Sequence, residues 1–288
     1  MSEDLSRRSA RPEGGVLLLA ATPLGDPGDA SQRLKDALAT ADVVAAEDTR
    51  RLGRLTAALG VTVTGRKVSF YEDVERARIP RLVEDLQGGA TVLVVTDAGM
   101  PAVSDPGFRL VAAAVEADVP VRCLPGPSAV LAALAVSGLP TDRFCFEGFA
   151  PRTDHKRDQW FTELADEPRT VVFFESPRRL GKTLQVAARV LGPDRRAVVC
   201  RELTKTHEEV LRGTLGELAA WAGPDVLGEI TVVLGPAVRK APEPDDLAAE
   251  VLALAADGRR LKDAAKEVGT AHGVPTNALY ESALRLRG

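Results

Sequence analysis

The sequence predicts an α/β protein with two α/β domains and a small helical extension at the C-terminus. Three observations support this prediction. Short runs of Val, Leu and Ala, each about one strand long, alternate with longer segments of helical periodicity. The alternation pauses at residues 138–144 and then resumes. Beyond residue 235, a segment rich in proline and charge separates the alternating part from a tail with only helical pattern.

The first half of the chain contains five apolar runs that we expect to be strands. They are VLLLAA at 16–21, VVAA at 43–46, KVSF at 67–70, TVLVV at 91–95 and VRCL at 121–124. Segments long enough for a helix separate most of these runs, and such crossover connections join parallel strands. We therefore expect a mainly parallel sheet that helices cover on both faces.

Helices are expected between these runs where apolar residues recur with helical spacing. The segments are 31–41 (SQRLKDALATA), Pro80 to Leu86, Phe108 to Glu116 and 128–136 (SAVLAALAV). Pro80 suits the first turn of its helix, because the backbone N–H that it lacks has no partner there. The pair Gly88-Gly89 ends the same helix.

The second half resumes the alternation after a hinge-like segment, GLPTDRF at 138–144. Helices are expected near Arg157–Leu164, Arg178–Leu191 and Leu215–Trp221, and strands at 170–175 (TVVFFE), 197–200 (AVVC) and 229–235 (EITVVLG). Residues 236–246 are Pro-rich and charged, which is typical of a linker. The tail holds about three helical segments, of which two span 259–268 and 276–286.

These boundaries predict four parts. They are a flexible leader at 1–14, an N-terminal α/β domain at 15–139, a C-terminal α/β domain at 140–237, and a linker with a small helical domain at 238–288. The leader is polar and lacks the apolar stretch of a secretory signal.

Composition narrows the class of protein. Lys and Arg number 37 against 41 Asp and Glu, which excludes a uniformly basic surface but not a local basic cleft. The three cysteines lie in apolar runs without a C-x-x-C pair, which indicates buried, reduced thiols in a cytoplasmic protein; they are Cys123, Cys145 and Cys200. The three histidines lie far apart, so we expect no metal site. No apolar run approaches the roughly 20 residues that cross a membrane.

The segment TDAGMPAVSDPG at 96–107 is the most unusual loop of the sequence. It follows an expected strand, and ligands of open α/β sheets lie beyond the carboxyl ends of strands. Its two glycines allow close approach of a ligand to the backbone, and its two prolines fix the chain. Asp97 and Asp105 can accept hydrogen bonds or meet a positive charge. A bare turn is the simpler alternative, but PGPSA at 125–129 and TPLGDPGD at 22–29 follow neighbouring strands in the same way.

Three well-known fingerprints are absent. The chain has no G-x-G-x-x-G after its first strand, no G-x-x-x-x-G-K-[ST] and no G-x-S-x-G. The sequence therefore does not predict a conventional dinucleotide dehydrogenase or a P-loop enzyme, and a serine hydrolase is disfavoured.

Charged segments follow several strands. In AAEDTR the acids Glu47 and Asp48 precede Arg50, where a helix cap with surface charges is the alternative interpretation. ESPRR at 175–179 and RELTK at 201–205 each resemble a solvated helix start when taken alone. Together their basic side chains suit a phosphodiester backbone; they are Arg178, Arg179, Arg201 and Lys205.

Seven motifs in order resemble one known family. AAEDTR, TDAGMPAVSDPG, PGPSA, GLPTDRFCFEGF, FFESPRR, RELTK and GEITVVL are similar to motifs of the tetrapyrrole methylase superfamily. Within it they resemble most the RsmI-type enzymes, which methylate the ribose 2′-hydroxyl of a cytidine in small-subunit (16S) ribosomal RNA. The similarity runs from about residue 16 to 235, and the helical tail resembles the C-terminal extension of those enzymes.

The resemblance implies that S-adenosylmethionine binds in a cleft between two α/β domains of a homodimeric, cytoplasmic enzyme without a metal. The matching cofactor positions are Pro23, Asp97, Ala98, Gly99, Met100, Val103, Ser104, Ser128, Ala129, Leu203, Glu229 and Ile230. Arg50, Arg178, Arg179 and Arg201 are expected to contact RNA. The general base is open between Glu47, Asp48, Glu175 and Lys205. The family usually carries His and Asn where this chain has 70–75 (FYEDVE), so no role of that His is carried over.

Two other functions compete with this interpretation. Fold does not determine substrate, so a small-molecule methylase that acts on a tetrapyrrole is one alternative. The other is a non-catalytic RNA-binding protein, because the tail has helix-turn-helix spacing with basic residues at its start. For the tail itself, a helical pair packed on the core is the simpler expectation.

Overall fold

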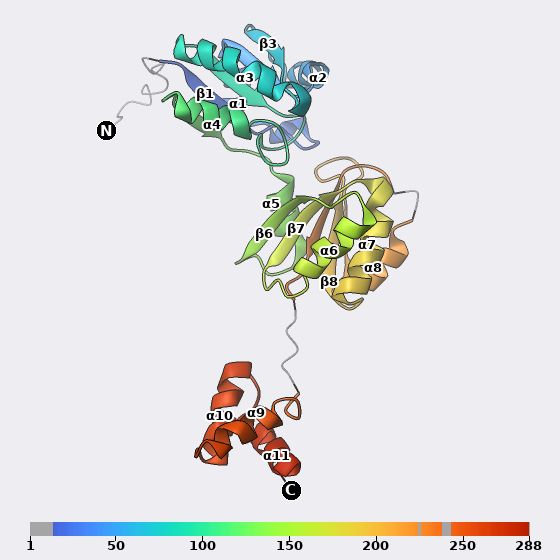
Figure 1. The fold of residues 1–288 in the computed structure, drawn as a ribbon. Coiled ribbons are helices and arrows are strands. Elements are labelled where there is room, and N and C mark those ends of the chain that lie inside the picture. The colour runs from blue at the N-terminus through green and yellow to red at the C-terminus, as the bar shows by residue number, and fades with distance from the viewer. Residues whose placement is uncertain (1–13, 224–225, 238–242, 288) are drawn as a thin grey trace, which may run out of the picture. The chain divides into compact units, whose positions relative to one another are not determined.

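The structure is a computed structural model that describes residues 14–223, 226–237 and 243–287 (Figure 1). The chain divides into two compact units, 1–237 and 238–288. The leader expected at 1–14 lies, except for residue 14, outside the described residues. The same holds for part of the expected linker.

The first sheet of the larger unit confirms the predicted parallel arrangement. Its strands are β1 (Val16–Ala20), β2 (Val43–Ala46), β3 (Arg66–Ser69), β4 (Thr91–Val95) and β5 (Val121–Leu124). They pair in the order β3-β2-β4-β1-β5, and all of the pairs are parallel. The carboxyl ends of β1, β2 and β4 therefore lie at one edge, side by side.

Helices cover both faces of this sheet, as the sequence predicts. The helices are α1 (Gln32–Thr40), α2 (Thr49–Leu59), α3 (Glu72–Gln87) and α4 (Phe108–Glu116). On β1, Leu17 and Leu19 pack with residues of α3 and α4, whereas Ala20 packs with residues of α1 and α2. Alternate strand residues thus serve two separate apolar layers, which explains why the central strands β1 and β2 are apolar throughout.

Two helices of the first half differ from the prediction. Helix α2, which follows the AAEDTR motif, was not predicted. Helix α3 begins at Glu72, so placing Pro80 in its first turn is wrong: Pro80 lies inside the helix. Pro80 is exposed, and without an N–H it cannot donate the helical hydrogen bond to the carbonyl of Arg76. Acidic residues in the first turn favour the earlier start, since they oppose the helix dipole.

The second sheet is mixed. Its strands are β6 (Phe144–Phe149), β7 (Thr170–Glu175), β8 (Arg196–Arg201), β9 (Glu209–Thr214) and β10 (Ile230–Leu234), in the order β6-β7-β10-β8-β9. Only β6 and β7 pair in parallel, and the other pairs are antiparallel. Neither β6 nor β9 was predicted. Both are edge strands with partly exposed residues, so neither produces a continuous apolar run.

Helices cover the second sheet unequally. On one face lie α6 (Asp154–Glu163), α7 (Pro177–Leu191) and α8 (Leu215–Trp221), whose apolar residues join one large core cluster. On the other face lies α5 (Ala129–Ser137), where Val130 and Leu134 pack with Val172 and Val233 of the sheet. Helix α5 lies in the range predicted for the N-terminal domain, yet it packs on the second sheet.

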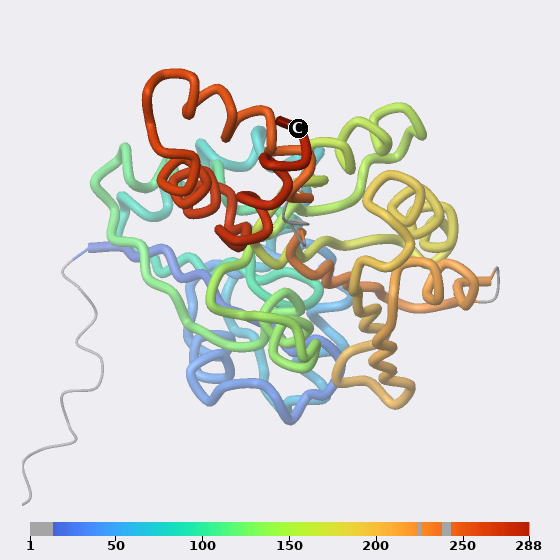
Figure 2. The backbone as a smooth tube through the Cα atoms, turned by 90° about the horizontal axis from the view of Figure 1, so that it is seen from below, coloured from blue at the N-terminus to red at the C-terminus, as the bar shows by residue number. Residues whose placement is uncertain are grey.

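The smaller unit is a group of three helices, as expected from the tail pattern. They are α9 (Ala248–Ala256), α10 (Leu261–His272) and α11 (Thr276–Arg287) (Figure 2). Their buried residues form a core cluster that includes Val251, Val268 and Leu279. The tail therefore has an apolar core of its own.

The expectation of three buried cysteines is wrong for two of them. Cys200 is buried, but Cys123 is exposed and Cys145 is partly exposed. The latter two lie on the edge strands β5 and β6, where one side of the strand is open. Across the described ranges, no helix is both long and apolar enough to cross a bilayer.

Candidate functional site

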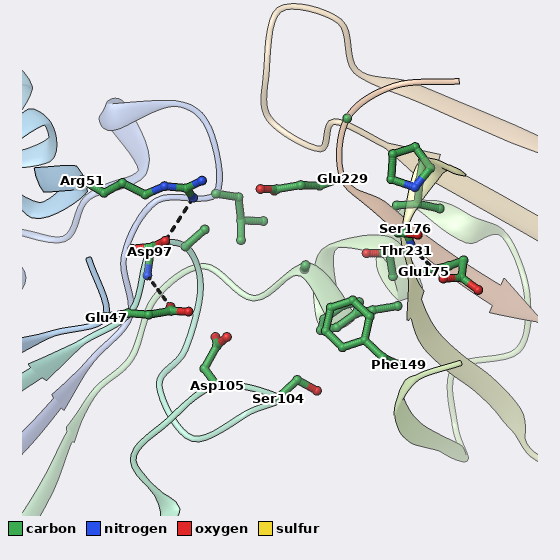
Figure 3. Close-up of a pocket in the computed structure, with 17 residues that line it drawn as sticks. Glu47, Arg51, Asp97, Ser104, Asp105, Phe149, Glu175, Ser176, Glu229 and Thr231 are labelled. Carbon is green, nitrogen blue, oxygen red and sulfur yellow. Dashed lines mark hydrogen bonds and ion pairs between the residues drawn. The ribbon is translucent and has the colours of Figure 1, made fainter. Parts of the chain in front are cut away.

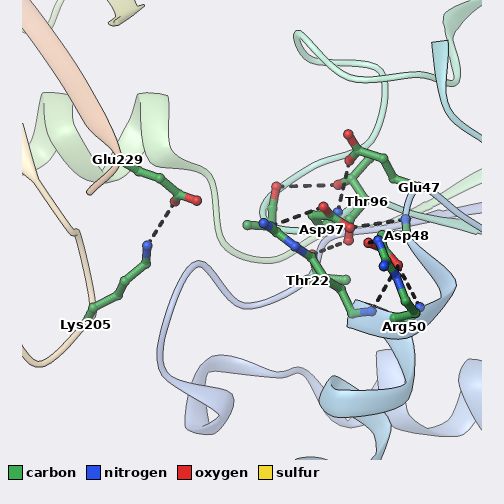
Figure 4. Close-up of polar contacts among 10 residues, drawn as sticks. Thr22, Glu47, Asp48, Arg50, Thr96, Asp97, Lys205 and Glu229 are labelled. Atoms are coloured by element: carbon green, nitrogen blue, oxygen red, sulfur yellow. Dashed lines mark hydrogen bonds and ion pairs between the residues drawn. The ribbon is translucent and has the colours of Figure 1, made fainter. Parts of the chain in front are cut away.

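The loops after β1 and β4 are joined at the edge where the parallel strands end. Thr22 and Gly99 exchange two backbone hydrogen bonds, with N···O distances of 2.9 Å and 3.1 Å. The Thr22 hydroxyl also donates to the carbonyl of Thr96 at 3.1 Å (Figure 4). Gly99 has φ 81°, which glycine adopts without steric cost. The loop predicted to hold a ligand is thus fixed at its first turn.

The rest of that loop has an unusual backbone. Ala102 and Ser104 have φ of 68° and 62°, and Gly107, which precedes α4, has φ 136°. Non-glycine residues in this region carry strain and are frequent at functional sites. Glu75 of α3, which is 3% exposed, anchors the end of the loop. It accepts hydrogen bonds from the Gly107 N–H at 2.9 Å and from Arg109 Nη1 at 2.7 Å.

A cavity of about 390 Å³ opens at this edge and extends to the second sheet (Figure 3). Its volume lies in the range of small-molecule sites. Predicted site residues in its lining are Glu47, Asp97, Ala98, Ser104, Ala129, Glu175, Glu229 and Ile230. A smaller space of about 40 Å³ shares part of this lining and adds the predicted residues Gly99, Met100, Val103 and Ser128. Pro23 and Leu203 are buried and line neither space.

The cavity is strongly acidic. Glu47, Asp97, Asp105 and Glu229 line it, and Arg51 is the one cationic side chain among the described residues of the lining. Arg51 Nη1 lies 3.1 Å from Asp97 Oδ2, and the Asp97 N–H donates to Glu47 at 3.2 Å. Burial raises the pKa of Glu47 and of Asp97. Burial, with repulsion from Glu47, Asp97 and Glu229, raises the pKa of Asp105 to about 7.

Two of the four candidate bases are already engaged by cations. Asp48 is the N-cap of α2, accepts hydrogen bonds from the backbone of Arg50 and Arg51, and pairs with the Arg50 guanidinium at 2.9 Å. The hydrogen bonds from Arg50 lower the pKa of Asp48, which weakens it as a base. Glu175 is 2% exposed, forms an ion pair with Arg179 at 2.5 Å and accepts a hydrogen bond from the Thr183 hydroxyl at 2.6 Å.

Lys205, the third candidate, belongs to an ion-pair cluster. Its Nζ lies 2.8 Å from Glu202 and 3.2 Å from Glu229 (Figure 4). Burial opposes its charge, but the hydrogen bond to Glu202 and the charge of Glu229 outweigh burial and raise the pKa of Lys205. A lysine held as a cation cannot accept a proton. Glu202 also accepts the Glu229 N–H at 2.8 Å, so it joins the turn after β8 to the segment before β10.

The turn after β8, at residues 202–205, also contacts the loop after β1. The Asp26 N–H donates to the Thr204 hydroxyl at 3.3 Å. A Cβ placed on Gly25 would lie 2.2 Å from Cγ of Lys205, so only glycine fits there. This loop includes a single 3-10 turn, Pro27–Asp29, capped by Asp26.

The four predicted RNA-contacting arginines differ in availability. Arg50 has a side chain that is 88% exposed, and Arg178 is also exposed. Arg179 is held by Glu175, and Arg201 pairs with Glu209 at 2.7 Å. Arg50, although it pairs with Asp48, and Arg178 are therefore the two whose side chains are exposed to an external partner.

Sequence reasoning did not assign several lining residues to the site. They are Leu24, Arg51, Asp105, Phe149, Phe174, Ser176, Pro177, Gly228 and Thr231. Asp105 was named from the sequence as able to accept hydrogen bonds or meet a positive charge, but it was given no role in the site. Phe149 offered no signal, because it ends an edge strand that was not predicted. Among the residues with described positions, no group of His, Cys, Asp and Glu is arranged to hold a metal ion.

Comparison with known proteins gives consistent results for the two units. The family model for Tetrapyrrole (Corrin/Porphyrin) Methylases matches residues 16–219, and that for the RsmI C-terminal HTH domain matches residues 241–287. "Ribosomal RNA small subunit methyltransferase I" of Mycobacterium tuberculosis is 58% identical over 274 residues, 95% of this chain and 96% of that protein. The protein of that name from Mesorhizobium japonicum is 44% identical over 280 residues, 96% of this chain and 94% of that one.

A solved structure supports the fold. Uroporphyrin-III C-methyl transferase from Thermus thermophilus, complexed with S-adenyl homocysteine, matches with a TM-score of 0.55 and 22% identity. The match covers 78% of this chain and 99% of that chain.

Proposed function

The chain belongs to the tetrapyrrole methylase family, in the branch of the small subunit ribosomal RNA methyltransferases I, and from this premise we propose its reaction. It is a methyltransferase that uses S-adenosylmethionine to modify the ribose 2′-hydroxyl of a cytidine in 16S ribosomal RNA. The observation that carries the proposal is the acidic cavity beside the strained loop 97–107.

The residues of the cavity suit the cofactor. S-adenosylmethionine supplies an electrophilic methyl group on a positively charged sulfur, and it carries an ammonium group as well. Carboxylates that are partly withdrawn from water attract such charges, and the polar backbone of the loop suits the zwitterionic methionine end. We assign cofactor contacts to Asp97, Ala98, Gly99, Met100, Val103, Ser104, Ser128, Ala129, Glu229 and Ile230.

The RNA contacts belong to exposed cations outside the cavity. Arg50 at the start of α2 and Arg178 at the start of α7 project from elements that border the cavity lining. Such side chains position a phosphate backbone without reading its sequence. The context of the reaction is a small ribosomal subunit in the cytoplasm.

We also propose that the enzyme is a homodimer. Large apolar side chains are exposed on α4, α5 and β6, among them Phe108 at 71%, Val115 at 62% and Leu131 at 56%. Exposed large apolar side chains are frequent in protein interfaces. Light scattering should give twice the mass of the chain, and Val115→Glu is expected to give a monomer.

The competing tetrapyrrole substrate is tested directly. We expect methyl transfer from labelled S-adenosylmethionine to small ribosomal subunits and none to uroporphyrinogen. Ribose-methylation mapping at nucleotide resolution, in cells with and without the protein, identifies the cytidine. Transfer to uroporphyrinogen alone, or binding of RNA without any transfer, would replace the proposed function by one of its two alternatives.

A further inference from the structure

Asp105 differs from every other carboxylate of the cavity in having no partner. Glu47 and Asp97 accept backbone hydrogen bonds, Glu175 is held by Arg179, and Glu229 pairs with Lys205. Within the described parts of the chain, no group donates a hydrogen bond to the Asp105 side chain or forms an ion pair with it. Figure 3 shows its carboxylate directed into the cavity, as that of Glu47 is.

The backbone on either side of Asp105 is firmly held. Ser104 before it has φ 62°, and Pro106 after it has a restricted φ. The Pro106 carbonyl accepts the Ala102 N–H at 3.2 Å, and the Gly107 N–H is bound by Glu75. The side chain is thus presented from a fixed frame while its oxygens stay unused. Such preorganisation is what a reacting group requires.

Asp105 also lies where the two spaces of the site meet. It lines the main cavity with Glu47 and Glu229, and it lines the smaller space with Met100 and Ser128. The smaller space is formed largely by positions assigned to the cofactor. A group at this junction can reach a substrate atom that enters the main cavity next to the bound donor.

We propose that Asp105 is the general base of the methyl transfer, a role that rests on the function proposed above. The ribose oxygen forms a bond to the methyl carbon while the carbon–sulfur bond breaks and its electron pair stays on sulfur. The hydroxyl proton passes to a carboxylate oxygen of Asp105, which thereby becomes neutral. Proton acceptance by a positioned side chain contributes about 10²- to 10⁴-fold to rate.

The electrostatic setting supports this role. Burial is the main cause that brings the pKa of Asp105 to about 7, with added repulsion from Glu47, Asp97 and Glu229. A base is most effective when its pKa is near the working pH. Arg51 is the cation of the lining, and it is paired with Asp97. A cationic ligand in the cavity favours the ionised form of Asp105, ready to accept a proton.

The test compares Asp105→Asn with wild type and with Asp194→Asn, an exposed aspartate between α7 and β8. In single-turnover methylation of small subunits, we expect Asp105→Asn to be slower by about 10²- to 10⁴-fold. Calorimetry should give an S-adenosylmethionine Kd within about threefold of wild type, because binding in the ground state is kept. Asp194→Asn should match wild type in both measurements.

Two further measurements separate a base from a structural residue. The wild-type rate should rise with pH to a plateau; Asp105→Glu should keep that inflection at a lower rate, and Asp105→Asn should lose it. In the free protein, carbon-13 NMR of labelled aspartate should show a carboxyl with a pKa of about 7, absent from Asp105→Asn and present in Asp194→Asn.

The possible failures are distinct. A rate of Asp105→Asn within about threefold of wild type overturns the assignment, and so does a loss of cofactor affinity as large as the loss of rate, which makes Asp105 a cofactor ligand. Wild-type protein that binds the cofactor but methylates no subunit overturns the proposed function and this assignment with it. An active wild type with an equally active variant overturns the assignment alone.

Discussion

The buried carboxylate of Glu75 accepts the backbone N–H of Gly107 at 2.9 Å, across 32 residues of sequence. The same carboxylate binds Arg109 on the first turn of α4, so one side chain of α3 fixes both the end of the strained loop and the start of the next helix. A segment with several residues at positive φ needs such anchors, because its backbone conformation is unfavourable on its own.

Replacing Glu75 by Gln should therefore loosen the loop. We expect Glu75→Gln to lower the free energy of unfolding by about 1–3 kcal/mol, because a charged hydrogen bond to Arg109 is lost in a buried place. S-adenosylmethionine affinity should fall about tenfold as the loop loses order. Urea unfolding and calorimetry measure the two effects. Glu116→Gln, on the exposed side of α4, serves as the control. Unchanged cofactor affinity in Glu75→Gln would mean that Glu75 contributes to stability but not to cofactor binding.

Asp105 makes the stability of the ligand-free protein depend on pH. The pKa of Asp105 is about 7 in the folded chain, above the ordinary value of 3.8. The stability that Asp105 contributes is therefore fully present below pH 3.8 and is lost as pH rises through 7. Asp105→Asn removes this loss. At pH 8 the variant should exceed wild type by about 1–2 kcal/mol in unfolding free energy, after a discount for partial exposure.

The difference should shrink toward zero near pH 4. Urea unfolding of both proteins at pH 4, 6 and 8 measures it. If the gain of Asp105→Asn in unfolding free energy were equal at all three pH values, the surroundings would not destabilise the Asp105 carboxylate. Stabilisation by removal of a functional charge is a frequent trade between stability and activity.

Lys205 is expected to act as a cation and not as a base. Lys205→Arg keeps the charge beside Glu202 and Glu229, so its methylation rate and pH profile should stay near those of wild type. Lys205→Met should lower the free energy of unfolding by about 0.2–1 kcal/mol, the range of a partly exposed ion pair. Loss of the pH inflection in Lys205→Arg would restore Lys205 as the candidate base.

Arg50 should contribute to RNA affinity through charge alone. Its side chain is 88% exposed, and its pair with Asp48 lies on the surface, so Arg50→Ala should leave the fold intact. The slope of log affinity for small subunits against log salt should fall in magnitude by about one. Arg81→Ala removes a similarly exposed, paired arginine of α3 and should leave the slope unchanged. Equal slopes for all three proteins would exclude Arg50 from the RNA surface.

The centre of the first sheet could be predicted because strands β1, β2 and β4 are buried on both faces. Strand β4, for instance, is a continuous run of apolar residues in sequence, and nearly all of it is buried. Strand β9 lies at a sheet edge with one buried position among its six residues, so its sequence resembles that of a loop. Burial on two faces therefore leaves a clear local signal, whereas an edge strand depends on a partner that lies elsewhere in the chain.

The site divides in a similar way. Loop 97–107 could be singled out because glycine, proline and aspartate are concentrated there, and several of its residues line the cavity. The general base of the site could not be predicted from the sequence, because Glu47 and Asp48 are neighbours in sequence with opposite environments. Helix α2 places Asp48 at its cap beside Arg50, while Glu47 turns into the cavity. The domain boundaries and the roles of the site residues stay predictions.

The close packing of Gly25 against Lys205 has a mechanical consequence. A shift of the 202–205 turn presses directly on residues 25 and 26, and Thr22 passes that movement to the backbone of Gly99. The turn at 202–205 and the loop after β1 are thus expected to move together and not independently. A substitution that displaces the turn at 202–205 is therefore expected to displace the loop around Gly99, which we assign to the cofactor, as well.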